Sequence, residues 1–383
     1  MAQVIRDLTD DEARHALGAK WGMADSDVLP AWVAEMDYAL APPVTEALHA
    51  AVEAGMTGYP PFRPGGALGE AYAGFARRHF GHEVEPENVL PVVDVTAGVR
   101  VALDVLCEPG PMIMPVPAYH PQLDIAEITG RERLDLVVDP DDERAELDLD
   151  RLDRLFADGA RTLLLTQPHN PWGRVFTRQE LEGVRDVVLR HGARVISDEI
   201  HAPLVLPGAE QVPYLSLEGT ADHAVAMVAS SKAFNTAGLK CAQMVTADPA
   251  TRARLTSIPY ARNDSWSTLG VVAAVAAYND GDPWLASLIE RLDEQRTLLA
   301  ALLAEHLPEA RMRPLEATYL VWLDLRAYGD DDPAATLLDK GRVWVNPGHH
   351  FHPGLPGHVR LNIATSPARL TEIVSRMGAA LAD

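Results

Sequence analysis

The stretch VASSKAFN, residues 228–235, decides the fold of this chain, because in it Lys232 stands two serines after the end of an apolar run. Asp198 lies 34 residues upstream in the motif VISDEIH, and Asn170 lies a further 28 residues upstream in TQPHNPWGRV. Each motif ends or follows a short apolar run, which is typical of a buried strand. Since ligands gather at the carboxyl ends of parallel strands, we expect the three side chains to converge on one site.

The chemistry of these three side chains indicates a pyridoxal phosphate site. A lysine amine forms a Schiff base with an aldehyde, a carboxylate keeps a pyridine nitrogen protonated, and an amide donates to a phenolate oxygen. We assign these tasks to Lys232, Asp198 and Asn170 respectively. A lone lysine after a strand is usually a solvated charge, so the assignment depends on finding all three motifs in this order.

Composition limits the class of protein. The chain has 383 residues, which predicts two domains, and its apolar content of 47% is ample to fill both cores. The net charge of -22 argues against binding to a nucleic-acid backbone. The first residues lack the apolar core of a signal peptide, and no apolar run approaches the roughly 20 residues that cross a bilayer. We therefore expect a cytoplasmic protein without a membrane partner.

Metal and disulfide chemistry are not expected. Cys107 and Cys241 are the two cysteines of the sequence, too few for a disulfide framework or a four-ligand metal site. The histidines at 349, 350 and 352 lie in a loop rich in glycine and proline, and we assign no metal to them.

The order of apolar runs predicts an α/β fold with a mostly parallel sheet sandwiched by helices. We expect a large cofactor-binding domain over residues 46–282 and a smaller α+β domain formed by residues 1–45 and 283–383. The predicted strands of the large domain are 89–93, 112–116, 162–166, 194–197, 224–229 and 241–246. The predicted elements of the small domain are a helix over 283–306, strands at 319–325, 343–345 and 358–363, and a last helix from 367.

A phosphate cradle is predicted in DVTAGVRVALDVL, residues 94–106. A helix that starts near Gly98 would offer free backbone N–H groups and the positive end of its dipole to a phosphate. We expect this cradle between Thr96 and Val99, with Ala97, Gly98 and Val99 as ligands. The alternative is an ordinary helix cap formed by Thr96.

Seven motifs together carry a family resemblance. The chain resembles, over nearly its full length, the fold-type I pyridoxal-phosphate enzymes of the aspartate aminotransferase superfamily, and it is most similar to the MalY/PatB-type cystathionine β-lyase (C–S lyase) branch. The motifs are AWVAEMDY (31–38), GYP (58–60), PVPAYHP (115–121), PHNPWGRV (168–175), SDEIH (197–201), SSKAFNTAGL (230–239) and RLNIA (360–364).

The resemblance implies roles for further residues. Tyr119 matches the aromatic residue that stacks on the cofactor ring and takes part in catalysis, and Ser230 matches a phosphate ligand. Arg360 matches the arginine that clamps the substrate α-carboxylate, a task suited to its planar fork. The residues that match the segment closing over the substrate are Trp32, Val33 and Ala34.

The resemblance also implies a homodimer with the active site at the subunit interface. In such a dimer Tyr59 reaches the cofactor phosphate of the partner. From the sequence alone, Tyr59 is a turn aromatic of the kind more often found in a core, so this role comes only from the resemblance.

Two residues depart from the pattern of many aminotransferases. Lys240 stands eight residues after Lys232, where many aminotransferases have a phosphate-binding arginine, and its part in phosphate binding is open. His201 stands where many have a tyrosine that bonds the ring oxygen, as in the lyase branch. The histidine favours a lyase, although it could equally be a structural residue.

The predicted function follows from these assignments. Lys232 and Asp198 serve removal of the Cα proton, after which loss of a thiolate from Cβ gives β-lysis and return of the proton to the cofactor gives transamination. The sequence favours a lyase that cleaves L-cystathionine or related cysteine S-conjugates to a thiol, pyruvate and ammonia. The alternative is an aminotransferase, or a tailoring enzyme of the same branch that acts on another amino acid. Members of this branch can also bind a transcription factor, which leaves a regulatory partner open.

Overall fold

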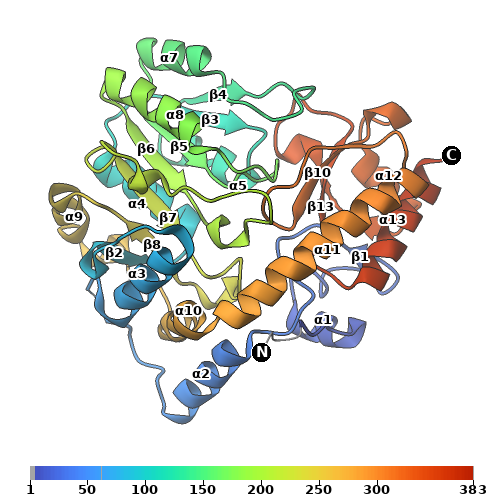
Figure 1. Cartoon of the computed structure of the whole chain (residues 1–383), viewed down its shortest axis with the longest axis horizontal. Helices are drawn as coiled ribbons and strands as arrows, with labels where there is room; N and C mark the ends of the chain where they lie inside the picture. Colours follow the sequence, from blue (N-terminus) through green and yellow to red (C-terminus); the bar gives the residue numbers. More distant parts are fainter. Residues whose placement is uncertain (1–4, 62, 383) are drawn as a thin grey trace.

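A seven-stranded mixed sheet forms the centre of the protein (Figure 1). The computed structural model describes residues 5–61 and 63–382. The strand order is β2-β8-β7-β6-β5-β3-β4, and β8 runs antiparallel to both of its neighbours, whereas the other pairs are parallel. The strands are β2 (Val89–Val92), β3 (Met112–Val116), β4 (Arg133–Val137), β5 (Thr162–Thr166), β6 (Arg194–Asp198), β7 (Ala224–Val228) and β8 (Ala242–Val245).

This sheet confirms the predicted α/β class, and six of its strands lie where the sequence predicts them. The exception is β4, for which no strand was predicted. Arg133 and Asp135 alternate with leucines in this strand and form an ion pair of 2.7 Å. Because β4 lies at the edge of the sheet, it is only partly buried and lacks the continuous apolar run that marks the inner strands.

Helices cover both faces of the large sheet. Successive residues of β5 point to opposite faces, so that Leu165 packs in one apolar cluster with Leu181 of α8, while Leu164 packs in another with Val99 of α4. The helices on the α8 side include α7 (Leu149–Ala157) and α8 (Arg178–His191), and those on the other side include α4 (Val95–Leu106) and α9 (Pro249–Thr256).

The ends of α8 illustrate how the sequence sets an element. Thr177 and Glu180 form a capping box at its start, in which each side chain accepts from the backbone N–H of the other. Gly192 ends the helix with a φ of 58°, a conformation that glycine adopts without strain. The remaining helices are α1 (Asp10–Ala16), α2 (Pro42–Glu53), α3 (Gly66–Phe80), α5 (His120–Leu123), α6 (Ile125–Ile128), α10 (Thr268–Asp280) and α12 (Pro333–Asp339).

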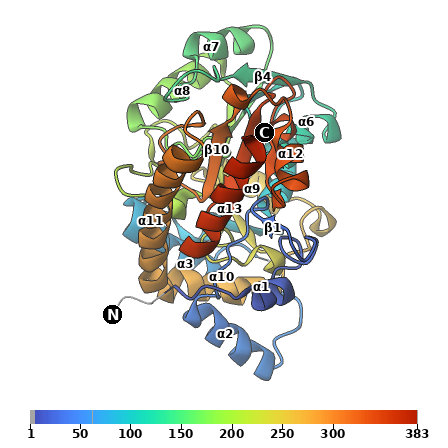
Figure 2. The ribbon, with the colours of Figure 1, turned by 90° about the vertical axis from the view of Figure 1, so that its right-hand side faces the viewer.

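A smaller antiparallel sheet is built by the last part of the chain. Its order is β12 (Asn346–Pro347), β13 (His358–Asn362), β10 (Leu320–Asp324) and β9 (Arg311–Met312). The helices α11 (Asp282–His306) and α13 (Pro367–Leu381) lie side by side next to it (Figure 2). The elements α11, α13, β10 and β13 match predicted helices and strands within a few residues, whereas β9 and β12 were not predicted. The strand predicted at 343–345 is present at Val343–Trp344, outside this sheet.

The N-terminal segment joins this smaller sheet region. Strand β1 (Leu29–Pro30) pairs in parallel with β11 (Val343–Trp344), so that chain ends far apart in sequence meet. The domain boundaries at residues 45 and 282 stay predictions, and residues 1–4, 62 and 383 of those predicted domains lie outside the described residues.

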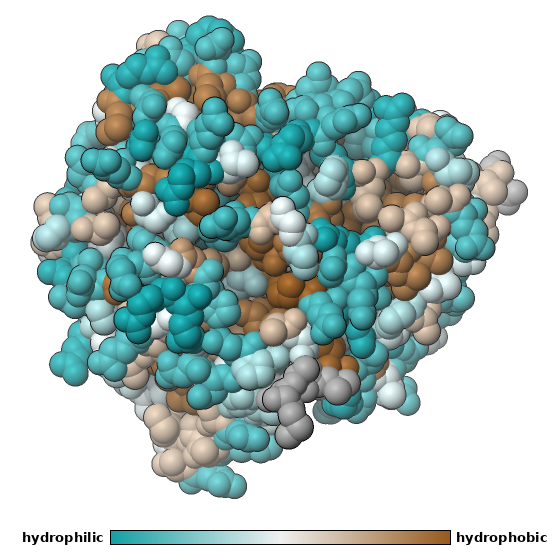
Figure 3. Space-filling view, in the orientation of Figure 1, coloured by the Kyte–Doolittle hydropathy of each residue, from teal (hydrophilic) through white to brown (hydrophobic). Residues whose placement is uncertain are grey.

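The surface is predominantly hydrophilic in the view of Figure 3, in keeping with the net charge of -22. Within the described ranges 5–61 and 63–382, no helix is both long and apolar enough to cross a membrane.

Candidate active site

A cavity lies where the central strands of the large sheet end. Asp198 is the last residue of β6, Lys232 follows β7, and Asn170 follows β5, so the three residues meet as their positions in the sequence predict. The cavity is lined by Ala34, Val95, Thr96, Tyr119, Gln122, Thr166, Asn170, Asp198, His201, Ser231, Lys232 and Lys240, among others.

Lys232 is half-buried, and the pKa of its amine is lowered. Its Nζ donates to the Ala34 carbonyl oxygen at 3.2 Å. Burial, with a smaller contribution from the nearby Arg360 guanidinium, lowers the pKa of Lys232 to about 8, while the carboxylates of Glu35 and Asp198 oppose the shift. A substantial fraction of neutral amine is therefore present just above neutral pH, as a nucleophile or proton acceptor requires.

Asp198 is buried and is held by two donors. Gln122 Nε2 donates to its Oδ2 at 2.6 Å, and the Ile200 N–H donates to its Oδ1 at 3.1 Å. Gln122 in turn accepts from Thr166 Oγ1 at 3.2 Å, which fixes the orientation of the amide. Burial raises the pKa of Asp198 to about 6, against the effect of these hydrogen bonds. A cationic partner in the cavity would favour the charged carboxylate.

Arg360 connects the small sheet to this cavity. The residue lies in β13, and its Nη1 donates to Asn170 Oδ1 at 3.1 Å while its Nη2 donates to the Trp32 carbonyl oxygen at 2.8 Å. Its guanidinium lies 4.9 Å from the centre of the Phe351 ring. Burial lowers the pKa of Arg360 to about 10, so it stays a cation at neutral pH. The bond to Asn170 Oδ1 leaves the amide Nδ2 of Asn170 as a donor.

His201 is a buried, neutral imidazole in the cavity wall. Burial lowers its pKa to about 3, and the charges of Lys232 and Arg360 act in the same direction. Within the part of the chain that the structure describes, its Nδ1 has no hydrogen-bond partner. A buried nitrogen without a partner in a cavity wall is suited to bonding a ligand.

The segment of residues 32–36 is tied to the small sheet. The Trp32 ring stacks on Trp344 with centroids 4.5 Å apart, so this side chain packs against the protein. Asn362 Nδ2 donates at 2.7 Å to the carbonyl oxygens of both Val33 and Glu35. Ala34, by contrast, lines the cavity.

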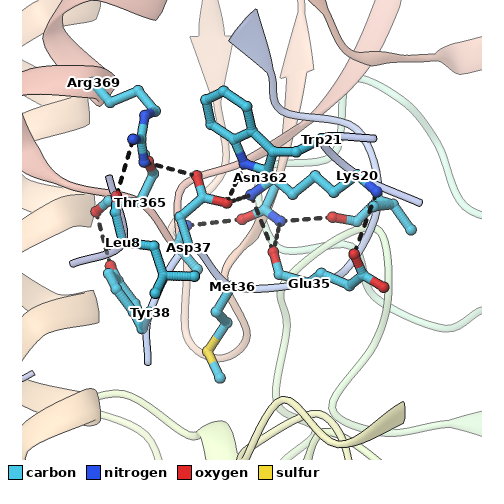
Figure 4. A network of polar contacts seen from close by, with 12 residues as sticks. Leu8, Lys20, Trp21, Glu35, Met36, Asp37, Tyr38, Asn362, Thr365 and Arg369 are labelled. Carbon is cyan, nitrogen blue, oxygen red and sulfur yellow. Dashed lines mark hydrogen bonds and ion pairs between the residues drawn. The ribbon is translucent and has the colours of Figure 1, made fainter. Parts of the chain in front are cut away.

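A buried ionic network holds Asp37, the residue that follows this segment (Figure 4). Asp37 pairs with Lys20 at 2.8 Å and with Arg369 at 3.3 Å, and it accepts from Trp21 Nε1 at 2.7 Å. Asp37 and Lys20 are both fully buried. Removing either partner of such a pair strongly destabilises the fold, because the remaining charge would be buried without a counterion.

The helix expected to hold a phosphate begins three residues earlier than predicted. Asp94 is the N-cap of α4, and its Oδ1 accepts from the Ala97 N–H at 2.8 Å, while its carbonyl oxygen accepts from the Gly98 N–H at 2.9 Å. The N–H groups of Ala97 and Gly98 are therefore already paired, and Val95 and Thr96 are the helix residues that line the cavity. The phosphate role of Ala97, Gly98 and Val99 stays a prediction.

Three other predicted residues occupy distinct environments. Tyr119 lines the cavity, and burial raises the pKa of its hydroxyl. Ser230 is buried, while its neighbour Ser231 lines the cavity. Tyr59 lies between α2 and α3 with 86% of its side chain exposed, so it does not reach the cavity of its own chain. Its predicted contact with a partner stays a prediction.

Comparison with known proteins establishes the family. Residues 26–377 match the family "Aminotransferase class I and II". The chain belongs to this family. A relative from Mycobacterium leprae is 40% identical over 99% of this chain and 98% of its own. A cystathionine beta-lyase of Corynebacterium glutamicum is 36% identical over 97% of this chain and 98% of its own. The curated relatives of this aminotransferase-family chain also include the MalY and PatB proteins.

A solved relative adds the fold and the cofactor. Cystalysin from Treponema denticola, whose structure contains pyridoxal 5'-phosphate, superposes with a TM-score of 0.92 at 27% identity, covering 99% of this chain and all of that one. The fold is thus that of the fold-type I enzymes, and the cofactor of this aminotransferase-family protein is pyridoxal 5'-phosphate.

The residues of the cavity fit this cofactor. Lys232 supplies an amine of lowered pKa, Asp198 a buried carboxylate, and His201 a buried nitrogen that lacks a protein partner. The start of α4 and the side chain of Lys240 supply positive potential for a phosphate in the same cavity. Sequence reasoning missed Gln122 and Asp94. The signals available were the position of Gln122 three residues after Tyr119 and the preference of aspartate for N-caps.

Proposed function

We propose that the protein is a pyridoxal-phosphate-dependent C–S β-lyase that cleaves L-cystathionine or a related cysteine S-conjugate to a thiol, pyruvate and ammonia. The observation that carries the proposal is that Lys232 and Asp198 line one cavity, while Arg360 donates a hydrogen bond to Asn170 in the wall of that cavity. The choice of lyase is supported by the cystathionine beta-lyase relatives and by His201 at the position where many aminotransferases have a tyrosine.

Each residue has a task in this proposal. When bound, the cofactor supplies an electron sink that makes the substrate Cα proton acidic. Lys232 holds the cofactor and, once free, accepts the Cα proton at Nζ. Asp198, kept in place by Gln122, faces the pyridine nitrogen as a carboxylate and holds its proton. Asn170 Nδ2 and His201 donate to the ring oxygen, and Tyr119 stacks on the ring.

The substrate is held from the small-sheet side. Arg360 clamps the α-carboxylate, and the segment of Trp32, Val33 and Ala34 closes over the substrate. Desolvation strengthens this clamp, because Arg360 is buried and retains its charge. With Cα and the carboxylate fixed, the Cβ–S bond can break as the Cα proton leaves, and the thiolate departs with the bonding electrons.

The proposed active unit is a homodimer. Tyr59 of each subunit would contact the cofactor phosphate of the other, and Ser230, Val95 and Thr96 would bind that phosphate within one chain. The high exposure of Tyr59 supports a contact outside its own subunit. Measurement of the oligomeric state, together with the cofactor affinity of a Tyr59→Phe variant, tests this part of the proposal.

The decisive experiment separates lyase from aminotransferase. The holoprotein is incubated with L-cystathionine in the absence of any keto acid, and thiol, pyruvate and ammonia are followed over time. A lyase produces many equivalents of thiol and pyruvate per site. An aminotransferase forms at most one equivalent of the keto acid of cystathionine, with the C–S bond intact, because its cofactor has then taken up the amino group. Formation of that keto acid without thiol and pyruvate refutes the lyase proposal. The Lys232→Ala protein is the control for background release.

An aminotransferase is the second candidate, favoured by the family match over residues 26–377. It would use the same Lys232 and Asp198, and the outcomes differ in whether the thiolate leaves Cβ or the proton returns to the cofactor. Formation of a new amino acid from a supplied keto acid, without thiol release, would establish it.

A further inference from the structure

An acidic side chain lies at the phosphate end of the cavity. Asp94 caps the start of α4, where the free N–H groups and the helix dipole attract anions, and it lines the same cavity as Lys232 and Asp198. Its Oδ1 already accepts from the Ala97 N–H at 2.8 Å. A carboxylate in this place competes with a phosphate for the same positive potential.

Lys240 is the counterpart of this carboxylate. Its Nζ lies 3.0 Å from Asp94 Oδ2, and it lines the same cavity. The side chains of Lys240 and Asp94 are 53% and 41% exposed, so their ion pair is screened by water and holds Lys240 only weakly. A phosphate dianion offers Lys240 a more highly charged partner than one carboxylate does.

We propose that Asp94 and Lys240 act as an opposed charge pair that sets the affinity for the cofactor phosphate. Lys240 pairs with the phosphate and at the same time shields it from Asp94, while Asp94 opposes phosphate binding. The protein therefore holds its cofactor less tightly than the same cavity would without Asp94. The contribution of Lys240 to cofactor affinity is therefore larger when Asp94 is present than when it is absent.

This proposal predicts coupling between the two residues. Asp94→Asn should tighten binding of pyridoxal 5'-phosphate about 10-fold, since it removes a negative charge beside a dianion. Lys240→Gln should weaken binding about 100-fold in the wild-type chain but only about 10-fold in the Asp94→Asn chain, because an uncompensated carboxylate faces the phosphate in the first case alone. Asparagine is as good an N-cap as aspartate, so α4 should remain intact.

The test measures equilibrium dissociation constants of the four apoproteins for the cofactor at fixed pH and ionic strength. Lys240 also lowers the pKa of Lys232, and any change in capture by Lys232 affects pyridoxal and the cofactor alike. Asp104→Asn is the matched control, because Asp104 lies exposed in the same helix and outside this cavity. Pyridoxal, which lacks the phosphate, is the matched ligand. Binding is followed without turnover, so the result does not depend on which reaction the enzyme catalyses.

We expect the four cofactor affinities to show a coupling of about 10-fold between positions 94 and 240. Asp104→Asn should not change the cofactor affinity, and the same four proteins should show no such coupling when they bind pyridoxal. Weaker binding by Asp94→Asn would overturn the proposal, since Asp94 would then serve to position Lys240. Equal losses from Lys240→Gln in both backgrounds would overturn it too, as would a matching gain from Asp104→Asn or an equal response to pyridoxal.

Discussion

Replacing Arg360 by alanine tests the substrate-binding side of the site most directly. The variant removes a buried cation, so a bound substrate carboxylate would be left without its charged partner. Loss of such a hydrogen-bonded charge pair costs about 2–4 kcal/mol, which is roughly a 30- to 700-fold weaker affinity. The segment above the site should stay in place, because the Trp32 carbonyl oxygen keeps a 2.8 Å bond from Asn346 Nδ2.

The assay compares two ligands that differ only in the carboxylate. L-alanine and ethylamine are each titrated into the holoprotein, and the change in the cofactor absorption band gives the affinity. Arg360→Ala should weaken the binding of L-alanine by the stated factor and affect the binding of ethylamine much less. Arg360→Lys should fall between, since it keeps the charge but not the planar fork. If both ligands weaken equally, or L-alanine does not weaken, Arg360 does not clamp the carboxylate.

Three further outcomes are expected. Lys232→Ala should lose the covalent cofactor link that borohydride fixes, and labelling of that variant at the same site would refute the assignment of Lys232. Asp198→Ala should still bind cofactor but turn over at least about 100-fold more slowly, as for other preorganised charges; near-normal turnover would point to another partner for the ring nitrogen. Asp37→Ala should lower the free energy of unfolding in urea by about 3–5 kcal/mol, whereas Glu372→Ala, which breaks an exposed pair, should cost under about 1 kcal/mol. Equal small losses would show that the buried network contributes little.

The inner strands and the three motif residues could be predicted because their signals are local. β5 and β6 are short strands with apolar centres at residues 163–165 and 195–196, and Asp198 ends β6. A strand of this kind can be predicted from its own sequence, without knowing which strands lie beside it. Where the alternation is half polar, as in β4, the same reasoning fails.

Gln122 and the start of α4 could not be predicted with the same ease. Gln122 sits in a helix of four residues, too short to show a period, and its contact with Asp198 spans 76 positions in the chain. In α4, both Thr96 and Gly98 resemble helix-start residues, and the true cap, Asp94, is revealed by the bond from its side chain to the Ala97 N–H. Arg360 was assigned through the resemblance, since the sequence of its strand does not indicate that its side chain contacts Asn170.

Lys232 is linked to the segment of residues 32–36 through one carbonyl oxygen. Ala34 O accepts from both Lys232 Nζ, at 3.2 Å, and the Tyr319 hydroxyl, at 3.1 Å. Two positions further on, the Met36 N–H donates to Asn235 Oδ1 at 3.0 Å, and Asn235 Nδ2 donates to the Met36 carbonyl oxygen at 2.9 Å. Asn235 lies three residues after Lys232. Attempts to broaden the substrate range by replacing residues 32–36 as a block would thus alter the lysine environment as well. Side-chain changes that preserve these backbone positions are the safer route for engineering.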